Sequence, residues 1–383
     1  MRSIPPLLIS TVLYFTLLIF FVPFADAKEV KTLELGATAP ELTLPGVDGK
    51  TYRLDDFSDA KVLIVVFTCN HCPTAQAYEE RIIQLHADYE AKGVALVAIS
   101  PNDPLAVRLD ELGYTDLGDS FEDMKRHAKR RGFKFPYLYD GETQRVATAY
   151  GALATPHVFI FDSKRKLRYN GRIDDADVKP PKSHDTRNAI DDLLAGQPVR
   201  VAKTRVFGCS TKWADKRESA EKSLAKWNAE PVTLKQIDQA GLRQLASNKT
   251  EHYLLVNLWS TTCVPCITEL PEFVTVNRMY RRRHFELITI TTDPPDRKNA
   301  ALQVLKKNHV SCRNYIFDSD DRDLLADALD AKWEGPVPYT ILIAPGGEIV
   351  KRWKDEVDPS ELKSEISTRL GKTYASRKIA TEK

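Results

Sequence analysis

Cysteine is scarce in this sequence, with six residues among 383. Small secreted domains that rely on disulfides for stability are short and dense in cysteine, so the sequence excludes a scaffold of that kind. Charge of one sign is not in excess either: the net charge is +2, which excludes bulk electrostatic attraction to nucleic acid or acidic lipid. What remains, 43% hydrophobic and 28% charged residues, is typical of a globular protein.

Beyond its first residues the chain has no apolar run long enough to cross a bilayer, which takes about 20 apolar residues. The beginning has Arg2, an apolar run over residues 7–24 and the small-residue sequence Ala-Asp-Ala at 25–27. This order is typical of a secretory signal peptide that is cleaved before Lys28; an uncleaved membrane anchor is the alternative. We therefore predict a signal peptide over residues 1–27 and a periplasmic or otherwise extracytoplasmic protein.

The same order of segments occurs twice in the chain. Each half has an apolar strand-like run, a C-x-x-C pair, a helical pattern and further strand-like runs. The expected strands are 62–67, 94–99, 157–161 and one from about 166 in the first half, and 254–259, 285–291, 339–343 and 348–353 in the second, which ends in a helix over 359–370. Alternating strands and helices predict the α/β class, and the nearly continuous apolar runs predict sheets covered on both faces.

The length of the chain predicts two domains, at roughly 150 residues each. We expect the first domain over residues 28–204 and the second over residues 233–372. A polar, helix-like linker over residues 205–232 would join them, and a polar tail would follow over residues 373–383.

Four of the six cysteines form two C-x-x-C pairs, Cys69 with Cys72 and Cys263 with Cys266. In each pair we expect the first sulfur to be exposed after a buried strand, and the second to be shielded one turn into a helix. The unpaired N–H groups and the dipole of a helix N-terminus favour thiolate over thiol. A thiolate attacks a substrate disulfide, and the second cysteine resolves the mixed disulfide. We therefore predict Cys69 and Cys263 as nucleophiles, and Cys72 and Cys266 as resolving residues.

The two pairs could instead close a single zinc site with four cysteine ligands. They lie far apart in the sequence, however, and each is placed inside its own βαβ pattern, which favours redox chemistry. We predict no metal, and no cofactor beyond the cysteines. Thr155-Pro156 and Val337-Pro338 each precede a strand-like run, and the sequence alone assigns neither bond as cis.

The second half, over about residues 233–372, resembles the TlpA/ResA family of exported thioredoxin-like reductases. The motifs of this resemblance are Trp259, C-V-P-C at 263–266 and E-L-P at 269–271. The resemblance implies a thioredoxin-like fold, a cis-proline at Pro338 that faces the active site, and a partly buried Glu269 that tunes the cysteines. Thr262 stands where the family has a second tryptophan, which affects the expected substrate contacts but not the redox pair.

The first half, over about residues 33–200, resembles the redoxin (AhpC/TSA-like) branch of the thioredoxin superfamily. The matching segments are G-A-T-A-P at 36–40, L-P-G-V-D-G-K at 44–50 and A-T-P-H at 154–157, which includes Thr155 and Pro156 as expected active-site support. Peroxiredoxins of this branch have a P-x-x-x-[ST]-x-x-C motif. Here Cys69 occupies the Ser/Thr position before Cys72, and the proline is missing, so the resemblance favours disulfide exchange over peroxidase activity.

Three further residues enter the hypothesis for the site. His71 lies inside the first pair, where a histidine can stabilise the thiolate and so make the pair a stronger oxidant; the alternative is an exposed polar residue. Cys209 either shuttles electrons for the first pair or is simply unpaired, and Cys312 is expected to be structural.

Taken together, the sequence predicts two thioredoxin-like folds in tandem, each a central mixed sheet flanked by helices. The predicted function is that of an exported thiol–disulfide oxidoreductase. Its expected partners are proteins with disulfides and an upstream thiol or membrane electron donor, with no nucleic acid. The alternatives are a thiol peroxidase, a factor for assembly of cytochrome c or a copper site, and a protein in which one domain only docks a partner.

Overall fold

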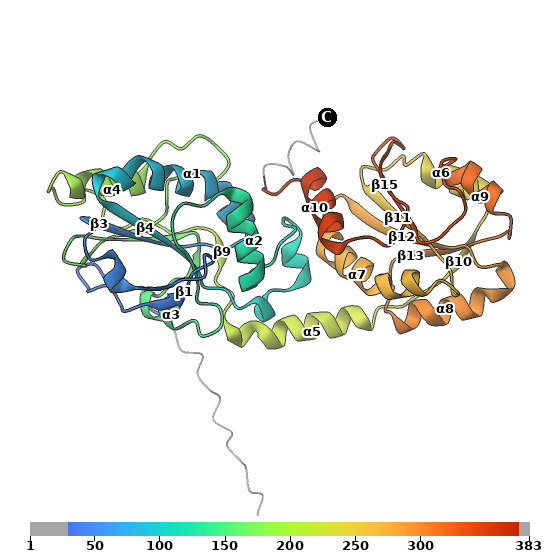
Figure 1. Cartoon of the computed structure of the whole chain (residues 1–383), viewed down its shortest axis with the longest axis horizontal. Helices are drawn as coiled ribbons and strands as arrows, with labels where there is room; N and C mark the ends of the chain where they lie inside the picture. Colours follow the sequence, from blue (N-terminus) through green and yellow to red (C-terminus); the bar gives the residue numbers. More distant parts are fainter. Residues whose placement is uncertain (1–29, 375–383) are drawn as a thin grey trace, which may run out of the picture.

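The computed structural model describes residues 30–374. The predicted signal peptide and residues 375–383 of the predicted tail lie outside these residues. The described chain forms two larger β-sheets, each flanked by helices (Figure 1), which confirms the predicted mixed α/β class. No helix within residues 30–374 combines the length and the apolar character needed to cross a bilayer.

The first half has a five-stranded sheet in the order β5-β4-β3-β7-β8. Its strands are β3 Val62–Phe67, β4 Val94–Ser100, β5 Tyr137–Tyr139, β7 His157–Phe161 and β8 Leu167–Gly171, and its helices are α1 Pro73–Tyr89, α2 Phe121–Arg131, α3 Arg145–Tyr150 and α4 Asp185–Leu194. A hairpin of β1 Thr43–Pro45 and β2 Thr51–Arg53 lies beside this sheet. Every residue of β3 is buried because its alternate side chains enter two different core clusters, one on each face of the sheet.

The second half has a six-stranded sheet in the order β10-β13-β12-β11-β14-β15. Its strands are β10 Lys235–Ile237, β11 Tyr253–Trp259, β12 Phe285–Thr291, β13 Arg313–Phe317, β14 Tyr339–Ile343 and β15 Ile349–Trp353, and its helices are α6 Gln239–Ala246, α7 Val264–Tyr280, α8 Lys298–Lys307, α9 Arg322–Leu329 and α10 Pro359–Leu370. In both halves the strand before the C-x-x-C pair is central, with a parallel neighbour on one side and an antiparallel neighbour on the other.

The predicted linker over residues 205–232 consists of two structurally different parts. Its first part contains β9 Cys209–Ser210, which pairs antiparallel with β6 Ala154–Thr155 of the first half. Its second part is α5 Arg217–Asn228, which runs along one side of the molecule from the first half to the second (Figure 1). The division of the chain into domains stays a proposal, and β9 belongs with the surface of the first half.

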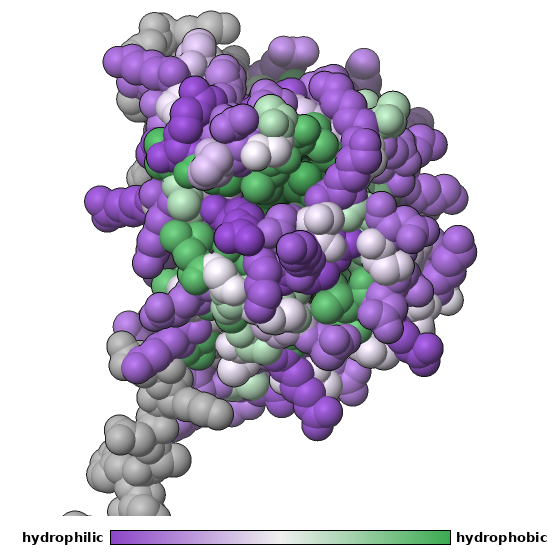
Figure 2. Space-filling model, turned by 90° about the vertical axis from the view of Figure 1, so that its left-hand side faces the viewer, coloured by the Kyte–Doolittle hydropathy of each residue, from purple (hydrophilic) through white to green (hydrophobic). Residues whose placement is uncertain are grey.

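The two halves also contact each other directly, between residues 109–116 and the end of α7. The Tyr280 hydroxyl donates to the Thr115 carbonyl at 2.7 Å, and Arg282 pairs at 2.6 Å with Asp110, whose side chain is 1% exposed. The outer end of the first half, by contrast, is covered mostly by hydrophilic side chains, and its apolar side chains gather in separate groups (Figure 2). The second half thus contacts the first half through the C-terminal end of α7, whereas Cys263 and Cys266 lie at the N-terminal end of this helix.

Candidate active sites

The second C-x-x-C pair is a disulfide at the start of α7. Cys263 and Cys266 are bonded, with their Cα atoms 5.3 Å apart. Cys263 is the N-cap of the helix, and its sulfur accepts the backbone N–H of Cys266 at 3.3 Å. Cys263 is partly exposed and Cys266 is fully buried, as the sequence predicts for this pair. The neighbouring Val264 is 72% exposed, so the accessible sulfur lies beside an apolar surface side chain.

The predicted support residues of the second pair lie around it. Trp259 is fully buried at the end of β11 and packs in one cluster with Cys266, Cys263 and Val337. The Val337-Pro338 bond is cis, as the resemblance implies. The structure thus brings the strand end, the cysteine pair and the X-Pro segment together, although the sequence separates them by more than 70 positions.

Glu269 lies one turn after Cys266 and is buried, at 5% exposed. Burial raises the pKa of this carboxyl to about 7. Two hydrogen bonds favour the charged form and offset part of this effect: the Asn257 side chain donates to Oε1 at 3.1 Å and the Val357 N–H to Oε2 at 3.2 Å. The side chain can therefore hold or release a proton near neutral pH, one helical turn from the disulfide.

Replacing Glu269 with glutamine is expected to stabilise the folded protein above pH 7. Because the pKa is raised from 4.5 to about 7, the folded state binds this proton more tightly, and stability falls as the pH rises through that window. Converting the whole pKa shift at ~1.4 kcal/mol per pKa unit would overstate the change in the free energy of unfolding, because solvent screens the charge of Glu269. We expect the variant to gain about 2 kcal/mol. Thermal unfolding at pH 5 and pH 8 measures it, with the exposed Glu348→Gln as control. An unchanged pH dependence would contradict the assignment.

The first C-x-x-C pair has a different register on its helix. Pro73 is the first residue of α1, so Cys72 is the N-cap and the Ala75 N–H donates to its sulfur at 3.5 Å. Proline is favoured at the first helical position because it needs no N–H partner there and its φ is already helical. The expectation that Cys72 lies one turn into the helix is therefore wrong. Cys72 holds the place that Cys263 has in the second half.

Both sulfurs of the first pair are buried and unbonded, with Cys69 5% exposed and Cys72 fully buried. The prediction that Cys69 is exposed is thus wrong as well, because β9 and the segment around Thr155 lie over it. The Cys69 sulfur is 3.2 Å from the Thr155 hydroxyl, and the Cys72 sulfur is 3.4 Å from the Thr155 carbonyl oxygen. A carbonyl accepts from a thiol but not from a thiolate, so the second contact belongs to the protonated form of Cys72. The Thr155-Pro156 bond is cis.

The environment shifts the pKa values of the two sulfurs in opposite directions. Burial alone would raise the pKa of Cys72, but hydrogen bonds from Cys209 and Cys69 and the charge of His71 hold it well below its usual range. Burial raises the pKa of Cys69 well above its usual range, and its hydrogen bond to Cys72 adds to this effect. These directions favour Cys72 over Cys69 as the nucleophile, and the roles of the two residues stay a prediction.

His71 is not an exposed polar residue, since its side chain is only 2% exposed. Its Nδ1 lies 2.5 Å from Asp119 Oδ2. Burial alone would lower the pKa of His71, but the Asp119 carboxylate raises it, and His71 in turn lowers the pKa of Asp119 against the effect of burial. Asp119 also accepts the backbone N–H groups of Asn70 and His71, at 2.9 and 3.1 Å, and the Asn102 side chain at 2.7 Å. These contacts fix the ring of His71, which has a nitrogen within 4.8 Å of the Cys69 sulfur, and the charge of His71 is among the causes that lower the pKa of Cys72.

Cys69, His71 and Asp119 also offer three buried ligand atoms within 4.8 Å of one another. Thiolate, imidazole and carboxylate are ligands that zinc or copper accepts. An ion there would compete with the 2.5 Å contact between His71 and Asp119 and would need Cys69 as thiolate, against the direction of its pKa. The absence of a metal stays a prediction, and the copper-assembly alternative stays open on this cluster.

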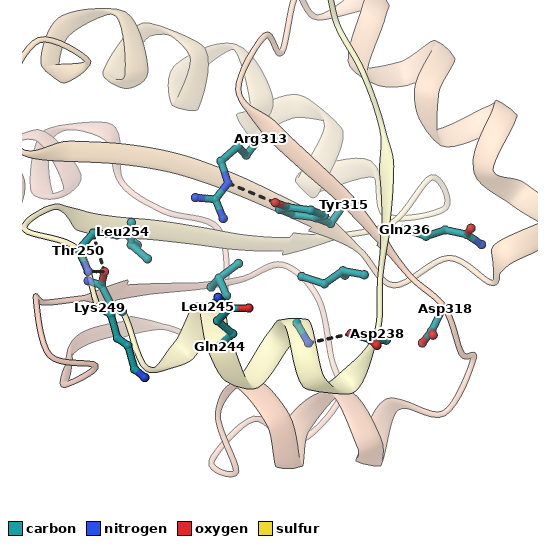
Figure 3. A pocket seen from close by; sticks show the side chains of 13 residues that line it. Gln236, Asp238, Gln244, Leu245, Lys249, Thr250, Leu254, Arg313, Tyr315 and Asp318 are labelled. Atoms are coloured by element: carbon teal, nitrogen blue, oxygen red, sulfur yellow. Dashed lines mark hydrogen bonds between the residues drawn. The ribbon is translucent and has the colours of Figure 1, made fainter.

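One pocket on the described chain lies away from both pairs. It has a volume of about 890 Å³ and lies along α6 and the edge strand β10, where Arg313, Tyr315, Gln236 and Leu254 line it (Figure 3). Leu254 is near the start of β11, whereas Cys263 follows the far end of that strand. A much smaller cavity, of about 10 Å³, lies beside Cys69 and is close to the volume that one water molecule needs.

Sequence reasoning missed Asp119 and Asn102. It offered Cys209 either as an electron shuttle or as an unpaired cysteine, and the structure places Cys209 beside the first pair. Asp119 is 48 positions from His71 and has no motif of its own, so no local signal identifies it. The helix register could have been found, because Pro73 directly follows Cys72 whereas Pro265 precedes Cys266.

Comparisons with known proteins agree with a tandem arrangement. The family model of the AhpC/TSA family matches residues 35–170 and again residues 207–352. The thiol-disulfide oxidoreductase ResA of Geobacillus thermodenitrificans is 25% identical over 183 residues, which cover 47% of this chain and 91% of that protein. ResA of Bacillus cereus is 26% identical over 143 residues, which cover 37% of this chain and 70% of that protein.

Two of the similar solved structures each match less than half of the chain. An uncharacterized conserved protein from Geobacillus kaustophilus is 40% identical, with a TM-score of 0.43, and the match covers 47% of this chain and 92% of that one. A thioredoxin domain of a thiol-disulfide oxidoreductase from Bacteroides vulgatus is 17% identical, with a TM-score of 0.30, over 36% of this chain and 89% of that one. The two matches of the family model, together with the two central sheets that each lead into a cysteine-bearing helix, confirm the predicted tandem of thioredoxin-like folds: the chain belongs to the AhpC/TSA family.

Proposed function

We propose that the protein is an extracytoplasmic thiol–disulfide oxidoreductase that reduces or exchanges disulfides of other proteins through both C-x-x-C pairs. The observation that carries this proposal is the Cys263–Cys266 disulfide, with one sulfur partly exposed beside Val264 and the other fully buried at the same helix N-terminus. The names of the ResA relatives support it. Export rests on the predicted signal peptide, and no cofactor beyond the cysteines is proposed.

At the second pair, the reduced form reacts through Cys263. Its thiolate, which accepts a helix N–H, attacks a substrate disulfide, forms a mixed disulfide and expels one substrate thiolate. Cys266 then attacks the Cys263 sulfur, closes the intramolecular disulfide and expels the second substrate thiolate, and the two departing sulfurs take up the protons of the two cysteines. Glu269, with a pKa of about 7, is placed to accept the proton of Cys266 as it becomes a nucleophile.

We infer that the two pairs do not exchange disulfides with each other directly. Helix α7 has 17 residues and is therefore about 25 Å long. Cys263 lies at its start, whereas Tyr280 at its end contacts Thr115 of the first half. We propose that each pair reacts with a separate partner, with an upstream thiol or membrane donor supplying the electrons.

The reduction potentials of the two pairs test the proposal. Each is measured by glutathione or dithiothreitol equilibration, in the full chain with Cys69→Ser/Cys72→Ser or with Cys263→Ser/Cys266→Ser. We expect the first pair to have the higher potential, by about 30 mV or more, because His71 stabilises its thiolate and 30 mV corresponds to ~1.4 kcal/mol. His71→Pro should remove most of this difference. If neither pair forms a reversible disulfide, or if the chelator EDTA abolishes reduction of a protein disulfide, the proposal fails.

A thiol peroxidase is the second candidate, for the first pair only. The Cys72 sulfur is fully buried at a helix N-terminus and its pKa is lowered, and a small oxidant reaches such a sulfur more easily than a protein does. Peroxide would oxidise Cys72 to the sulfenic acid, and a second thiol would condense with it and release water. Peroxide consumption that depends on Cys72 supports this candidate, whereas its absence leaves disulfide exchange.

A further inference from the structure

A third cysteine is built into the first pair. In the pairing of β9 with β6, Cys209 lies directly opposite Thr155, the residue that contacts both sulfurs of the pair. The Cys209 side chain packs against Cys69 and Cys72. Cysteines distant in sequence are thus gathered around one threonine.

Gly208 is what allows β9 to come this close. Its φ is +155°, and a Cβ at this position would lie 2.2 Å from the Thr155 carbonyl oxygen. Only glycine fits such an approach of one backbone to another. The glycine before Cys209 is therefore required to place Cys209 next to the pair.

The three sulfurs differ in their access to solvent. Cys72 is fully buried and Cys69 nearly so, whereas Cys209 is partly exposed. A disulfide of another protein is too bulky to reach Cys72 through the side chains that cover it. Among the three, Cys209 is the sulfur that faces the outside while still contacting the buried pair.

The hydrogen bond between Cys209 and Cys72 places the resting proton on Cys209. The hydrogen bond to Cys72 is the largest cause that raises the pKa of Cys209, followed by burial, while the same bond lowers the pKa of Cys72. A thiol that donates to a neighbouring thiolate can pass its proton to that thiolate as it reacts. Tyr374, near the end of the described chain, lies beside this cluster, and burial together with the two cysteines raises its pKa to about 12.

We propose that Cys209 is a third redox-active residue, the surface thiol through which the buried Cys69/Cys72 pair exchanges disulfides with a protein partner. The proposal rests on the proposed function of the first pair. Cys209 passes its proton to Cys72 and attacks the partner disulfide, which gives a mixed disulfide and one partner thiolate. Cys72 gives that proton to the departing thiolate and attacks the Cys209 sulfur, which forms the Cys72–Cys209 disulfide and releases the second partner thiolate.

The last step transfers the disulfide to the buried pair and regenerates Cys209. Cys69 gives its proton to the second partner thiolate and attacks the Cys72 sulfur, so that the Cys69–Cys72 bond forms and Cys209 leaves as a thiolate that solvent protonates. In sum, the partner disulfide is reduced to two thiols, and Cys69 and Cys72 are oxidised to one disulfide. Cys209 is unchanged at the end, as a relay requires.

The test uses the full chain with Cys263→Ser/Cys266→Ser, so that only the first centre reacts, and insulin as the protein disulfide. Cys209→Ser should lower the rate of insulin reduction by at least about tenfold, whereas Cys312→Ser, the matched change at the other lone cysteine, should leave it within about twofold. The serine hydroxyl of Cys209→Ser can still donate to Cys72, so hydrogen peroxide should still oxidise the buried pair in this variant, which separates the relay from structural damage.

A second variant traps the intermediate. With Cys69→Ser added to the same background, oxidation should give a Cys72–Cys209 disulfide in the peptide mass spectrum. Insulin reduction at full rate in Cys209→Ser, or no such disulfide, would overturn the relay. A parent background that does not reduce insulin at all would instead refute the proposed function of the first pair.

Discussion

Replacing Cys72 with serine is expected to abolish the activity of the first centre and to remove its low-pH thiolate. In the Cys263→Ser/Cys266→Ser background, thiolate absorbance near 240 nm should be present at pH 6 and absent in Cys72→Ser. The reason is that the pKa of Cys72 is held well below its usual range, while those of Cys69, Cys209 and Cys312 are all raised. Activity should fall by more than about 10³-fold, the scale for loss of a nucleophile.

The matched control for this prediction is Cys69→Ser. It removes one hydrogen bond to Cys72 but leaves the bond from Cys209 and the charge of His71, so the thiolate absorbance at pH 6 should persist. The opposite pattern, with the absorbance lost in Cys69→Ser and kept in Cys72→Ser, would restore the roles that the sequence predicts. The experiment therefore decides which sulfur of this pair is the nucleophile.

The sequence predicted most of the secondary structure because the strands are apolar runs buried on both faces. Strands over 285–291 and 339–343 and the helix over 359–370 have the predicted bounds. Runs of this kind leave no solvated face, so neither their type nor their length depends on details of packing. The resemblance of each half to a family supplied the fold, which hydrophobic pattern alone does not specify.

The roles within the first pair were not predictable from the C-x-x-C spacing. Four positions define the motif, but the N-cap is set by where the helix begins, and Pro73 moves that start past Cys72. Asp119 determines the charge of His71 from a separate loop, and Cys209 reaches the pair through a strand pairing 54 positions away from Thr155. These contacts depend on burial and on pairing between distant segments, and a short sequence motif predicts neither.

Replacing Asp119 with asparagine removes the negative charge that raises the pKa of His71. We expect His71 to lose its charge as a result and the pKa of Cys72 to rise. Removing one partner of a buried ion pair costs about 3–5 kcal/mol, which chemical denaturation at pH 6 measures. The exposed Asp55→Asn is the control and should change stability by less than about 0.5 kcal/mol. Thiolate absorbance at pH 6 should fall in Asp119→Asn, since the charge of His71 is one of the causes that lower the pKa of Cys72.

The loss of stability in Asp119→Asn should depend on pH, because the pKa values of Asp119 and His71 are shifted in opposite directions. The pKa of Asp119 is lowered, so its contribution is present above the ordinary carboxyl pKa and is lost on acidification. The pKa of His71 is raised, so its contribution is complete below about pH 6.5 and declines as the pH rises through the folded-state value. The stability difference between the native chain and Asp119→Asn should therefore be largest near pH 5–6 and should narrow above neutrality. A difference that does not change with pH, with the thiolate absorbance intact, would mean that Asp119 only fills space and that the His71 charge plays no part in activating Cys72.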